Sequence, residues 1–511
     1  SWQASWVRDN TGLEVQRTFS GGVTVRTERD CFGREVHKSV RSGGIEQGAY
    51  RYQWGIANRL LSKENDLTGT VTRYDYDRFD FLIRQETMQG SETDVIYRVP
   101  DFVGNLFETP DKKDRKYGAG GKLLEDPDCF YHYDDEGNLI FREFKQLQET
   151  GAKFDRKRME KERGIRCLAT GTGWLYEWSS NGMLKKVIRP DGRPVEFRYD
   201  ALGRRTAKQY FGKVTRWVWD GNVPIHEWGY KVTDRQPNEE ENTPSKEPIE
   251  DITTWVFEAG TFVPTAKILE GKQYSIVSDY LGTPIQMYDE QGNKTWDCNL
   301  DIYGKVTNFA GSSLNECPFA YQGMYFDKET NLCYNRYRYY SSETGSYLSQ
   351  DPIRLQGGSR LYGYVIDINS WVDIFGLSGF FTPTVFNAPS GNTHIVYQQN
   401  IDWDLPVNTR DGIKTNLELA QQGKSPFVVK DGVYSQINLH HSKQNAQGSL
   451  FELSAATHQR YYGTNALHPH LPNAHPDNPV NRDLFNLDRE EYWRKRAEAE
   501  INARKAQGGC H

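Results

Sequence analysis

The chain has 511 residues, of which 37% are hydrophobic and 13% aromatic, and its formal net charge is −6 at pH 7. This length is too great for one ordinary hydrophobic core and predicts roughly three domains. The acidic balance argues against a uniformly basic nucleic-acid coat, although it leaves a local basic patch open. The 30 tyrosines and 46 glycines favour short strands and turns. The composition therefore predicts a β-rich protein.

The seven cysteines lie far apart and form no C-x-x-C pair. The sequence therefore predicts neither a disulfide framework nor a zinc ribbon, and it fits a reducing compartment of origin. No run of 18 apolar residues occurs, so we expect no membrane span. The first residues, SWQASWVRDN, lack a signal-peptide pattern and already read as β sequence. We expect a further N-terminal portion of the protein to precede them.

A degenerate unit recurs through the first three quarters of the chain: an aromatic residue, Asp, two or three residues, then Gly and a polar residue. The clearest copy is FRYDALGRRTAKQ at 197–209, and YHYDDEGNLIFRE at 131–143 is another. In each unit Asp accepts a hydrogen bond from the backbone ahead, and Gly takes the positive φ of the turn. Such hairpins in series predict a long antiparallel sheet. Their irregular spacing argues against a propeller or a sandwich, and the acidic stretch 234–250 predicts an exposed loop.

These units resemble the YD repeats of the Rhs, teneurin and insecticidal toxin-complex proteins, and residues 319–378 are similar to the terminus of the Rhs core almost throughout. The resemblance implies a mainly β fold with a hollow YD-repeat β-shell, or cocoon, at 1–318. The core terminus follows at 319–377, and a separate C-terminal domain occupies 378–511.

The resemblance also implies that the chain cuts itself between Leu377 and Ser378. The aspartates of DPIRL and DIFGL, Asp351 and Asp373, would carry out this reaction. Two carboxylates held close together cannot both ionise, so one keeps a proton and the other activates a water molecule. Their spacing alone favours a simpler interpretation, in which both aspartates only begin turns. The family resemblance shifts the balance to cleavage.

The repeats stop after Leu377, and eight of the 11 histidines fall in residues 378–511. The pattern there predicts a short helix over about 414–422, the strand VYSQINLHH, a loop and a second strand, SLFEL. Ser454 is a good N-cap for a helix that follows. A hairpin with a packed helix would direct His440, His441 and His458 at one point, which is the ββα-metal arrangement.

The LHH motif, together with the elements around it, resembles the LHH branch of the HNH/endonuclease VII superfamily over roughly residues 410–500. The resemblance implies that His440, His458 and His468 bind a divalent metal ion, Mg²⁺, Mn²⁺ or Zn²⁺. His441 would be the general base that deprotonates a water molecule. For Glu452 we weigh a role in orienting a metal ligand against a solvent-facing position, and the second is favoured.

The stretch 482–506 predicts an amphipathic helix with Trp493, Ala497 and Ile501 on one stripe. Its basic side chains either contact phosphates or form a solvated face, and the solvated face is slightly favoured. These side chains are Arg494, Lys495, Arg496, Arg504 and Lys505.

Together these resemblances predict an interbacterial toxin in which a β-cocoon encapsulates a metal-dependent endonuclease that cuts DNA. They imply three partners: the DNA substrate, a cognate immunity protein, and type VI spike or adaptor proteins bound through a preceding N-terminal region. The protein would be made in the bacterial cytoplasm, secreted, and active in the cytoplasm of the target cell. The alternatives are a metal-dependent RNase on the same fold and a non-enzymatic YD-repeat surface scaffold.

Overall fold

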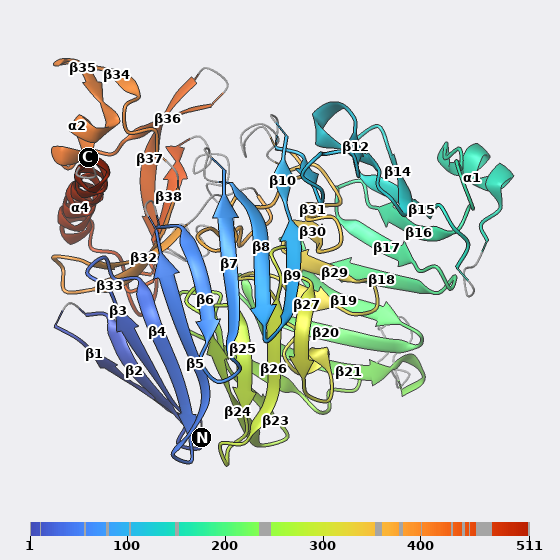
Figure 1. Cartoon of the computed structure of the whole chain (residues 1–511), viewed down its shortest axis with the longest axis horizontal. Coiled ribbons are helices and arrows are strands. Elements are labelled where there is room, and N and C mark those ends of the chain that lie inside the picture. Colours follow the sequence, from blue (N-terminus) through green and yellow to red (C-terminus); the bar gives the residue numbers. More distant parts are fainter. Residues whose placement is uncertain are drawn as a thin grey trace.

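The computed structural model of the chain is mainly β, as the sequence predicts (Figure 1). Its described strands form two long sheets, a small four-stranded sheet, a mixed sheet near the C-terminus and two separate strand pairs. The structure describes residues 2–10, 12–55, 58–77, 81–101, 104–148, 153–234, 247–352, 360–377, 382–399, 401–430, 433–441, 445–448, 450–455 and 473–508.

The first long sheet has nine strands, which follow one another in space in their sequence order. Each strand pairs antiparallel with the next, as a series of hairpins predicts. The strands are β1 (Ala4–Arg8), β2 (Glu14–Phe19), β3 (Thr24–Arg29), β4 (Glu35–Ser42), β5 (Ile45–Trp54), β6 (Leu60–Asn65), β7 (Thr70–Tyr76), β8 (Leu82–Gln89) and β9 (Glu92–Tyr97).

The second long sheet has sixteen strands, again in sequence order. They are β12 (Lys116–Tyr117), β13 (Leu123–Glu125), β14 (Cys129–Tyr133), β15 (Leu139–Phe144), β16 (Gly173–Trp178), β17 (Leu184–Ile188), β18 (Pro194–Tyr199), β19 (Arg205–Tyr210), β20 (Lys213–Asp220), β21 (Val223–Lys231), β22 (Thr253–Phe257), β23 (Pro264–Leu269), β24 (Lys272–Ser278), β25 (Pro284–Tyr288), β26 (Lys294–Leu300) and β27 (Val306–Ala310).

Short elements connect the strands of this region. They are the pair β10 (Val99–Pro100) and β11 (Leu106–Phe107), helix α1 (Arg156–Arg163), and the 3₁₀ turns η2 (Ala119–Gly121), η3 (Val232–Asp234) and η4 (Leu314–Glu316). Most of the acidic stretch predicted to be an exposed loop lies outside the described residues. Its described end is tied down, because Glu247 forms an ion pair with Arg216 at 2.7 Å.

The repeat unit forms the predicted turn. At Asp200 the carboxylate oxygen Oδ1 accepts hydrogen bonds from the backbone N–H groups of Leu202 and Arg204, both at 2.9 Å. Gly203 has a φ of +73° and donates its N–H to the carbonyl of Asp200. Side chains other than glycine are strained at such a φ, which explains the glycine of the unit. The same arrangement recurs at Asp30, Asp279, Asp289 and Asp301.

The two long sheets pack against each other face to face. Tyr50 and Leu60 of the first sheet share a buried cluster with Val277 and Tyr288 of the second. The Lys38 ammonium donates to the carbonyl of Ser278 at 2.9 Å across the same interface. In Figure 1 the blue strands of the first sheet accordingly lie next to β23–β26 of the second. The chain thus folds back on itself and buries one face of each sheet.

Residues 319–377 are here called the core-terminal segment, and its described part packs against the second sheet. The segment contains a four-stranded sheet whose tyrosines Tyr334 and Tyr339 pack against Phe197 and Val187. The strands of this small sheet are β28 (Tyr325–Asp327), β29 (Leu332–Asn335), β30 (Arg338–Ser341) and β31 (Ser346–Tyr347).

The C-terminal domain forms a five-stranded sheet in the order β32-β33-β38-β37-β36. Neighbours are antiparallel except for β33 and β38, which run parallel. Its elements are β32 (Thr382–Asn387), β33 (Thr393–Gln398), β34 (Pro406–Thr409), β35 (Gly412–Thr415), α2 (Asn416–Gln421), β36 (Phe427–Lys430), β37 (Val433–His441), β38 (Leu450–Ser454) and α4 (Arg482–Gly508).

Helix α4 covers one face of this sheet. Trp493 and Ala497, which are fully buried, pack with Ile437 and Leu439 of β37, so the predicted apolar stripe of the helix is confirmed at these two residues, whereas Ile501 is half-buried. In Figure 1 this domain, with α4 in dark red and α2 in orange, lies at the upper left edge of the molecule.

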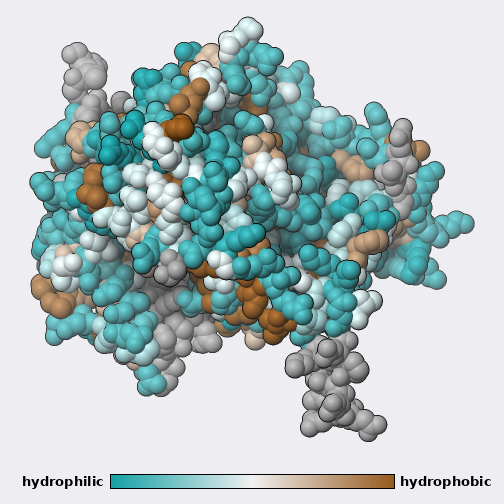
Figure 2. Space-filling view, turned by 90° about the horizontal axis from the view of Figure 1, so that it is seen from below, coloured by the Kyte–Doolittle hydropathy of each residue, from teal (hydrophilic) through white to brown (hydrophobic). Residues whose placement is uncertain are grey.

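Seen from below, the surface is mostly hydrophilic, with a small hydrophobic area near its lower centre (Figure 2). Among the described residues, no helix is long and apolar enough to cross a membrane. All six described cysteines are free.

Candidate functional site

The segment before the predicted cleavage site is itself a repeat-like turn. Asp373 Oδ1 accepts the N–H of Leu377 at 3.0 Å, and Gly376 has a φ of +64°. A Cβ at Gly376 would lie 2.5 Å from the carbonyl oxygen of Asn335, so only glycine fits there without a shift. Asp373 thus begins a turn, as the simpler interpretation predicts, and its carboxylate also holds the residue that precedes the predicted cut.

Arg338 joins the two aspartates. Its nitrogen Nη2 lies 3.2 Å from a carboxylate oxygen of Asp351 and 3.2 Å from one of Asp373. All three side chains are at most 2% exposed. The structure therefore brings the two predicted aspartates to one buried point.

Sequence reasoning missed Arg338, because nothing in the spacing of RYRYY ties it to aspartates that follow later in the chain. Its guanidinium is a buried cation shared by both carboxylates. The charge of Arg338 offsets the mutual repulsion on which the expectation of one retained proton was based.

Other groups hold the same turn. The Tyr347 hydroxyl donates to Asp373 Oδ2 at 2.8 Å, and Asn335 Nδ2 donates to the Asp373 carbonyl at 2.7 Å. Arg338 Nε donates to the carbonyl of Gly376. The backbone leading to Leu377 is therefore fixed at several atoms. Ser378, on the far side of the predicted cut, lies outside the described residues.

The histidine pair ends strand β37, as predicted. Successive side chains of a strand point to opposite faces of the sheet. His441 lies opposite Leu450, which belongs to the core under α4, whereas His440 lies opposite Phe451 on the other face. The two adjacent histidines therefore point to opposite sides of the sheet, and the expectation that the hairpin directs both at one point is wrong.

On the α4 side, His441 is enclosed by rings. The ring of Phe485, from the first part of α4, lies 4.2 Å from it, and the ring of His394, from β33, lies 5.5 Å from it. Burial, and then the neighbouring His394, lowers the pKa of His441 to about 3. His441 is therefore neutral at pH 7, as a general base must be, but in this environment its affinity for a proton is weak.

On the other face, His440 lies beside an interface with the core-terminal segment. Phe451 stacks on Tyr397 at 4.7 Å, and the Tyr397 hydroxyl donates to Gln322 Oε1 at 3.3 Å. The same cluster contains Ile374 and Phe375, which lie three and two residues before Leu377. His440, at 8% exposure, is therefore buried on the side of the sheet that meets the core-terminal segment.

The favoured interpretation of Glu452 as a solvent-facing residue is wrong. Glu452 is 1% exposed, and its carboxylate accepts hydrogen bonds from Tyr492 and Arg496 of α4 and from the N–H of Gln399. Helix α4 covers the face of β38 that carries Glu452. The bonds of Glu452 fasten the helix to the sheet.

The predicted metal ligands are described only in part. His458 and His468 lie outside the described residues, and helical structure begins at Ala455, directly after Ser454. Within the described part of the chain, no three His, Cys, Asp or Glu side chains form a group that could hold a metal ion. His440 supplies one imidazole, and its fit to a complete metal site depends on residues beyond those described.

Three of the five predicted basic side chains of α4 are held in ion pairs. Arg496 pairs with Glu452 at 3.0 Å, Arg494 with Glu490 at 3.3 Å, and Arg504 with Asp404 at 2.9 Å. The favoured interpretation of a solvated face fits Arg494 and Arg504, whereas Arg496 is largely enclosed by the protein.

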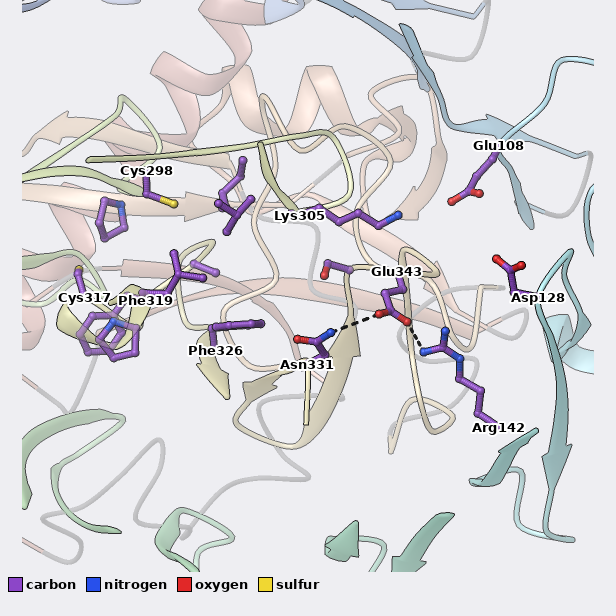
Figure 3. Close-up of a pocket in the computed structure, with 18 of the residues that line it drawn as sticks. Glu108, Asp128, Arg142, Cys298, Lys305, Cys317, Phe319, Phe326, Asn331 and Glu343 are labelled. Carbon is purple, nitrogen blue, oxygen red and sulfur yellow. Dashed lines mark hydrogen bonds and ion pairs between the residues drawn. The ribbon is translucent and has the colours of Figure 1, made fainter. Parts of the chain in front are cut away.

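A cavity of about 550 Å³ lies between the first and last strands of the second long sheet. None of the described candidate residues lines it. One end is charged and the other apolar, and the labelled side chains are Glu108, Asp128, Arg142, Lys305, Asn331 and Glu343 at the charged end and Cys298, Cys317, Phe319 and Phe326 at the apolar end (Figure 3).

Comparison with known proteins identifies two regions. The sequence profile described as "Teneurin YD-shell" matches residues 20–356. The profile described as "A nuclease of the HNH/ENDO VII superfamily with conserved LHH" matches residues 415–499. Both resemblances stated from the sequence are confirmed, and the second match contains the histidine pair.

Among similar proteins, "Probable deoxyribonuclease RhsA" of Dickeya dadantii is 26% identical over 412 residues, which cover 75% of this chain and 26% of that protein. "Double-stranded DNA deaminase toxin A" of Burkholderia cenocepacia is 27% identical over 452 residues, covering 83% of this chain and 29% of that protein. These two names state different activities. Similarity over most of the chain therefore does not decide which activity this chain has.

The chain spans about a quarter of the length of these curated relatives. Among solved structures, the crystal structure of TcdB2-TccC3-TEV is 19% identical with a TM-score of 0.36, and the match covers 74% of this chain and 21% of that chain.

Proposed function

The chain belongs to the teneurin YD-shell family, and from this premise we propose that it is part of an interbacterial toxin whose β-shell carries a C-terminal, metal-dependent DNA endonuclease. The observation that carries the proposal is the β37–β38 hairpin. It places His440 and His441 on opposite faces of the sheet at the end of one strand, is followed by helical structure at Ala455, and lies within the match to an LHH nuclease.

In this proposal His441 accepts the proton of the attacking water molecule. Its low pKa keeps the imidazole unprotonated at neutral pH, and opening toward solvent at Phe485 would raise its proton affinity. His440, with His458 and His468, would hold a divalent ion. When bound, such an ion stabilises the negative charge that develops on the phosphate.

We also propose that Asp351 and Asp373 cut the chain between Leu377 and Ser378. The support is their convergence on Arg338 and the hydrogen bond from the Leu377 N–H to Asp373. Arg338 offsets the charge of both carboxylates, and the fixed turn holds the backbone at Leu377 in one orientation. The cut would break the covalent link between the shell and the C-terminal domain.

The remaining parts of the proposal concern the whole protein. A name such as "Probable deoxyribonuclease RhsA" favours DNA as the substrate. The proposal further includes encapsulation by the shell and delivery by type VI spike or adaptor proteins. It also includes a cognate immunity protein and action in the target cytoplasm. Each of these rests on the family rather than on a described contact.

The test is nucleic-acid cleavage by the full 511-residue chain. Linear duplex DNA and structured RNA are incubated separately with the protein and Mg²⁺, Mn²⁺ or Zn²⁺, with EDTA as the control for metal dependence. His441→Ala is compared with His37→Ala, a change at a half-buried histidine in the first long sheet. We expect metal-dependent cutting of DNA that only His441→Ala abolishes.

Two other outcomes would contradict this proposal in different ways. Degradation of RNA with intact DNA would favour an RNase on the same fold. If neither nucleic acid is cut and bacteria that express the chain grow normally, the non-enzymatic surface scaffold would be favoured.

A further inference from the structure

His394 lies next to His441 but outside the segment matched by the nuclease profile, which begins at residue 415. It belongs to β33, which β38 separates from the strand of the histidine pair. Its side chain is 1% exposed, on the face of the sheet that α4 covers. A histidine this deeply buried is unusual unless its ring nitrogens have a specific task.

One ring nitrogen of His394 has a defined role. Nδ1 lies 2.7 Å from the carbonyl oxygen of Gly448. Because a carbonyl only accepts hydrogen bonds, Nδ1 carries the proton and donates it. In the neutral ring Nε2 is then a bare acceptor, and among the described residues no group bonds to this buried atom.

Gly448 belongs to the connection between β37 and β38, which starts directly after His441. Asn392 donates from Nδ2 to the carbonyl of Ala446 in the same connection, at 3.3 Å. The Ala446 N–H in turn donates to the carbonyl of Asn478 at 3.0 Å. The start of β33 therefore fastens the hairpin connection that carries the chain away from the histidine pair.

The ring of His441 stands between two rings. His394 lies 5.5 Å away at an interplanar angle of 77°, and Phe485 lies 4.2 Å away on α4. Asp488, one turn further along α4, is 3% exposed and accepts the N–H of Ser390 at 2.8 Å. No hydrogen bond to a described residue holds His441 itself, so its orientation depends on these neighbours.

We propose that His394 is a positioning residue for the nuclease centre: it fixes the hairpin connection through Gly448 and sets the orientation of the His441 ring. The inference rests on the proposed function of His441 and adds a residue from outside the matched segment. A general base must lie within hydrogen-bond reach of the proton that it removes, so a misplacement of about 1 Å lowers the rate by about 100-fold.

The test separates the Nδ1 donor from the shape of the ring. His394→Asn keeps an N–H donor near the Nδ1 position, His394→Gln places its amide near the Nε2 position instead, and His394→Phe keeps a ring without any donor. Cleavage of a labelled DNA duplex by the full chain gives kcat and KM for each variant. Hydrogen exchange at residues 445–448 reports the state of the connection directly.

We expect His394→Phe and His394→Gln to lower kcat at least about tenfold with little change in KM, because the base is displaced while the DNA contacts remain. His394→Asn should retain most of the activity. Exchange at residues 445–448 should accelerate in the Phe and Gln variants and match wild type in the Asn variant.

Several outcomes would overturn the inference. Wild-type cleavage with an unchanged kcat in His394→Phe would show that the ring does not act through His441. Equal losses in all three variants would show that the Nδ1 donor is not the determinant. Unchanged exchange in the Phe and Gln variants would show that His394 does not fix the connection through Gly448, even if the wild-type protein cut no nucleic acid. Accelerated exchange in these variants, with a wild type that cuts no nucleic acid, would contradict only the proposed function.

Discussion

The ring of Phe375, two residues before the predicted cleavage site, lies 6.2 Å from the ring of Phe451 on β38. Phe375 also meets Phe262 of the shell edge to face, with ring centroids 5.5 Å apart. Phe451 neighbours His440 across the hairpin. The segment that would be cut therefore also docks the C-terminal domain through the sheet face that carries a predicted metal ligand.

The first prediction follows from this docking. Phe375→Ala removes a half-buried ring from the interface while it leaves the C-terminal sheet itself unchanged. We expect the docked state to lose about 2 kcal/mol, less than a fully buried Phe→Ala change costs. Hydrogen exchange in β33 and β38 should accelerate relative to wild type. Phe211→Ala, at a residue that is 74% exposed, is the control and should change nothing. Equal exchange in both variants would show that Phe375 does not hold the domain.

The second prediction concerns self-cleavage. Asp373→Asn keeps an oxygen that can accept the Leu377 N–H. It removes one of the two carboxylate charges that pair with Arg338. If Asp373 activates water, cleavage should slow by at least about 100-fold. Gel electrophoresis would then show one intact band where the parent shows two. Asp289→Asn, at an exposed turn where Asp289 accepts the N–H of Asn293 as Asp373 accepts that of Leu377, is the control and should cleave normally. Two bands from Asp373→Asn would remove this residue from the mechanism.

The repeats could be predicted from the sequence because the residues that form each turn are close together in the chain. Asp200 and Gly203 make their turn within five residues, and the same spacing recurs along the chain. The strand VYSQINLHH and the helix with Trp493 and Ala497 were also predictable, since periodicity marks a buried side of one element.

The rest depends on contacts between distant residues, which spacing does not encode. Arg338 reaches Asp373 across 35 positions, and His394 reaches Gly448 across 54. Glu452 was expected to face solvent. In the structure α4 covers one face of the sheet and the core-terminal segment meets the other, so residues on both faces of β38 are buried.

The third prediction is a loss of stability in acid. Burial, and then His394, lowers the pKa of His441 from 6.5 to about 3, and burial also lowers the pKa of His394. Below pH 6.5 the unfolded chain binds protons that the folded domain does not bind, so stability falls as the pH drops from 6.5 toward 3. At pH 5 the low pKa of His441 alone should reduce the free energy of unfolding by about 2 kcal/mol relative to neutral pH.

Hydrogen exchange of β37 and α4 at pH 7 and at pH 5, corrected for the intrinsic rate, measures this effect. His441→Leu should reduce the difference between the two conditions, because one of the two histidines is gone. An opening free energy that is the same at both pH values in wild type would show that His441 is not buried as described.

The fourth prediction compares two ion pairs of α4. Glu452 is fully buried against Arg496, whereas Glu490 and Arg494 are both about half exposed. Glu452→Gln leaves the Arg496 cation enclosed without its counter-charge, which typically costs about 3 kcal/mol. Glu490→Gln removes an exposed partner and should cost less than about 1 kcal/mol. Thermal unfolding followed by hydrogen exchange in α4 distinguishes them: the helix should detach first in Glu452→Gln and behave as wild type in Glu490→Gln. Equal small effects would show that apolar contacts of Trp493 and Ala497 hold α4 without help from the ion pair.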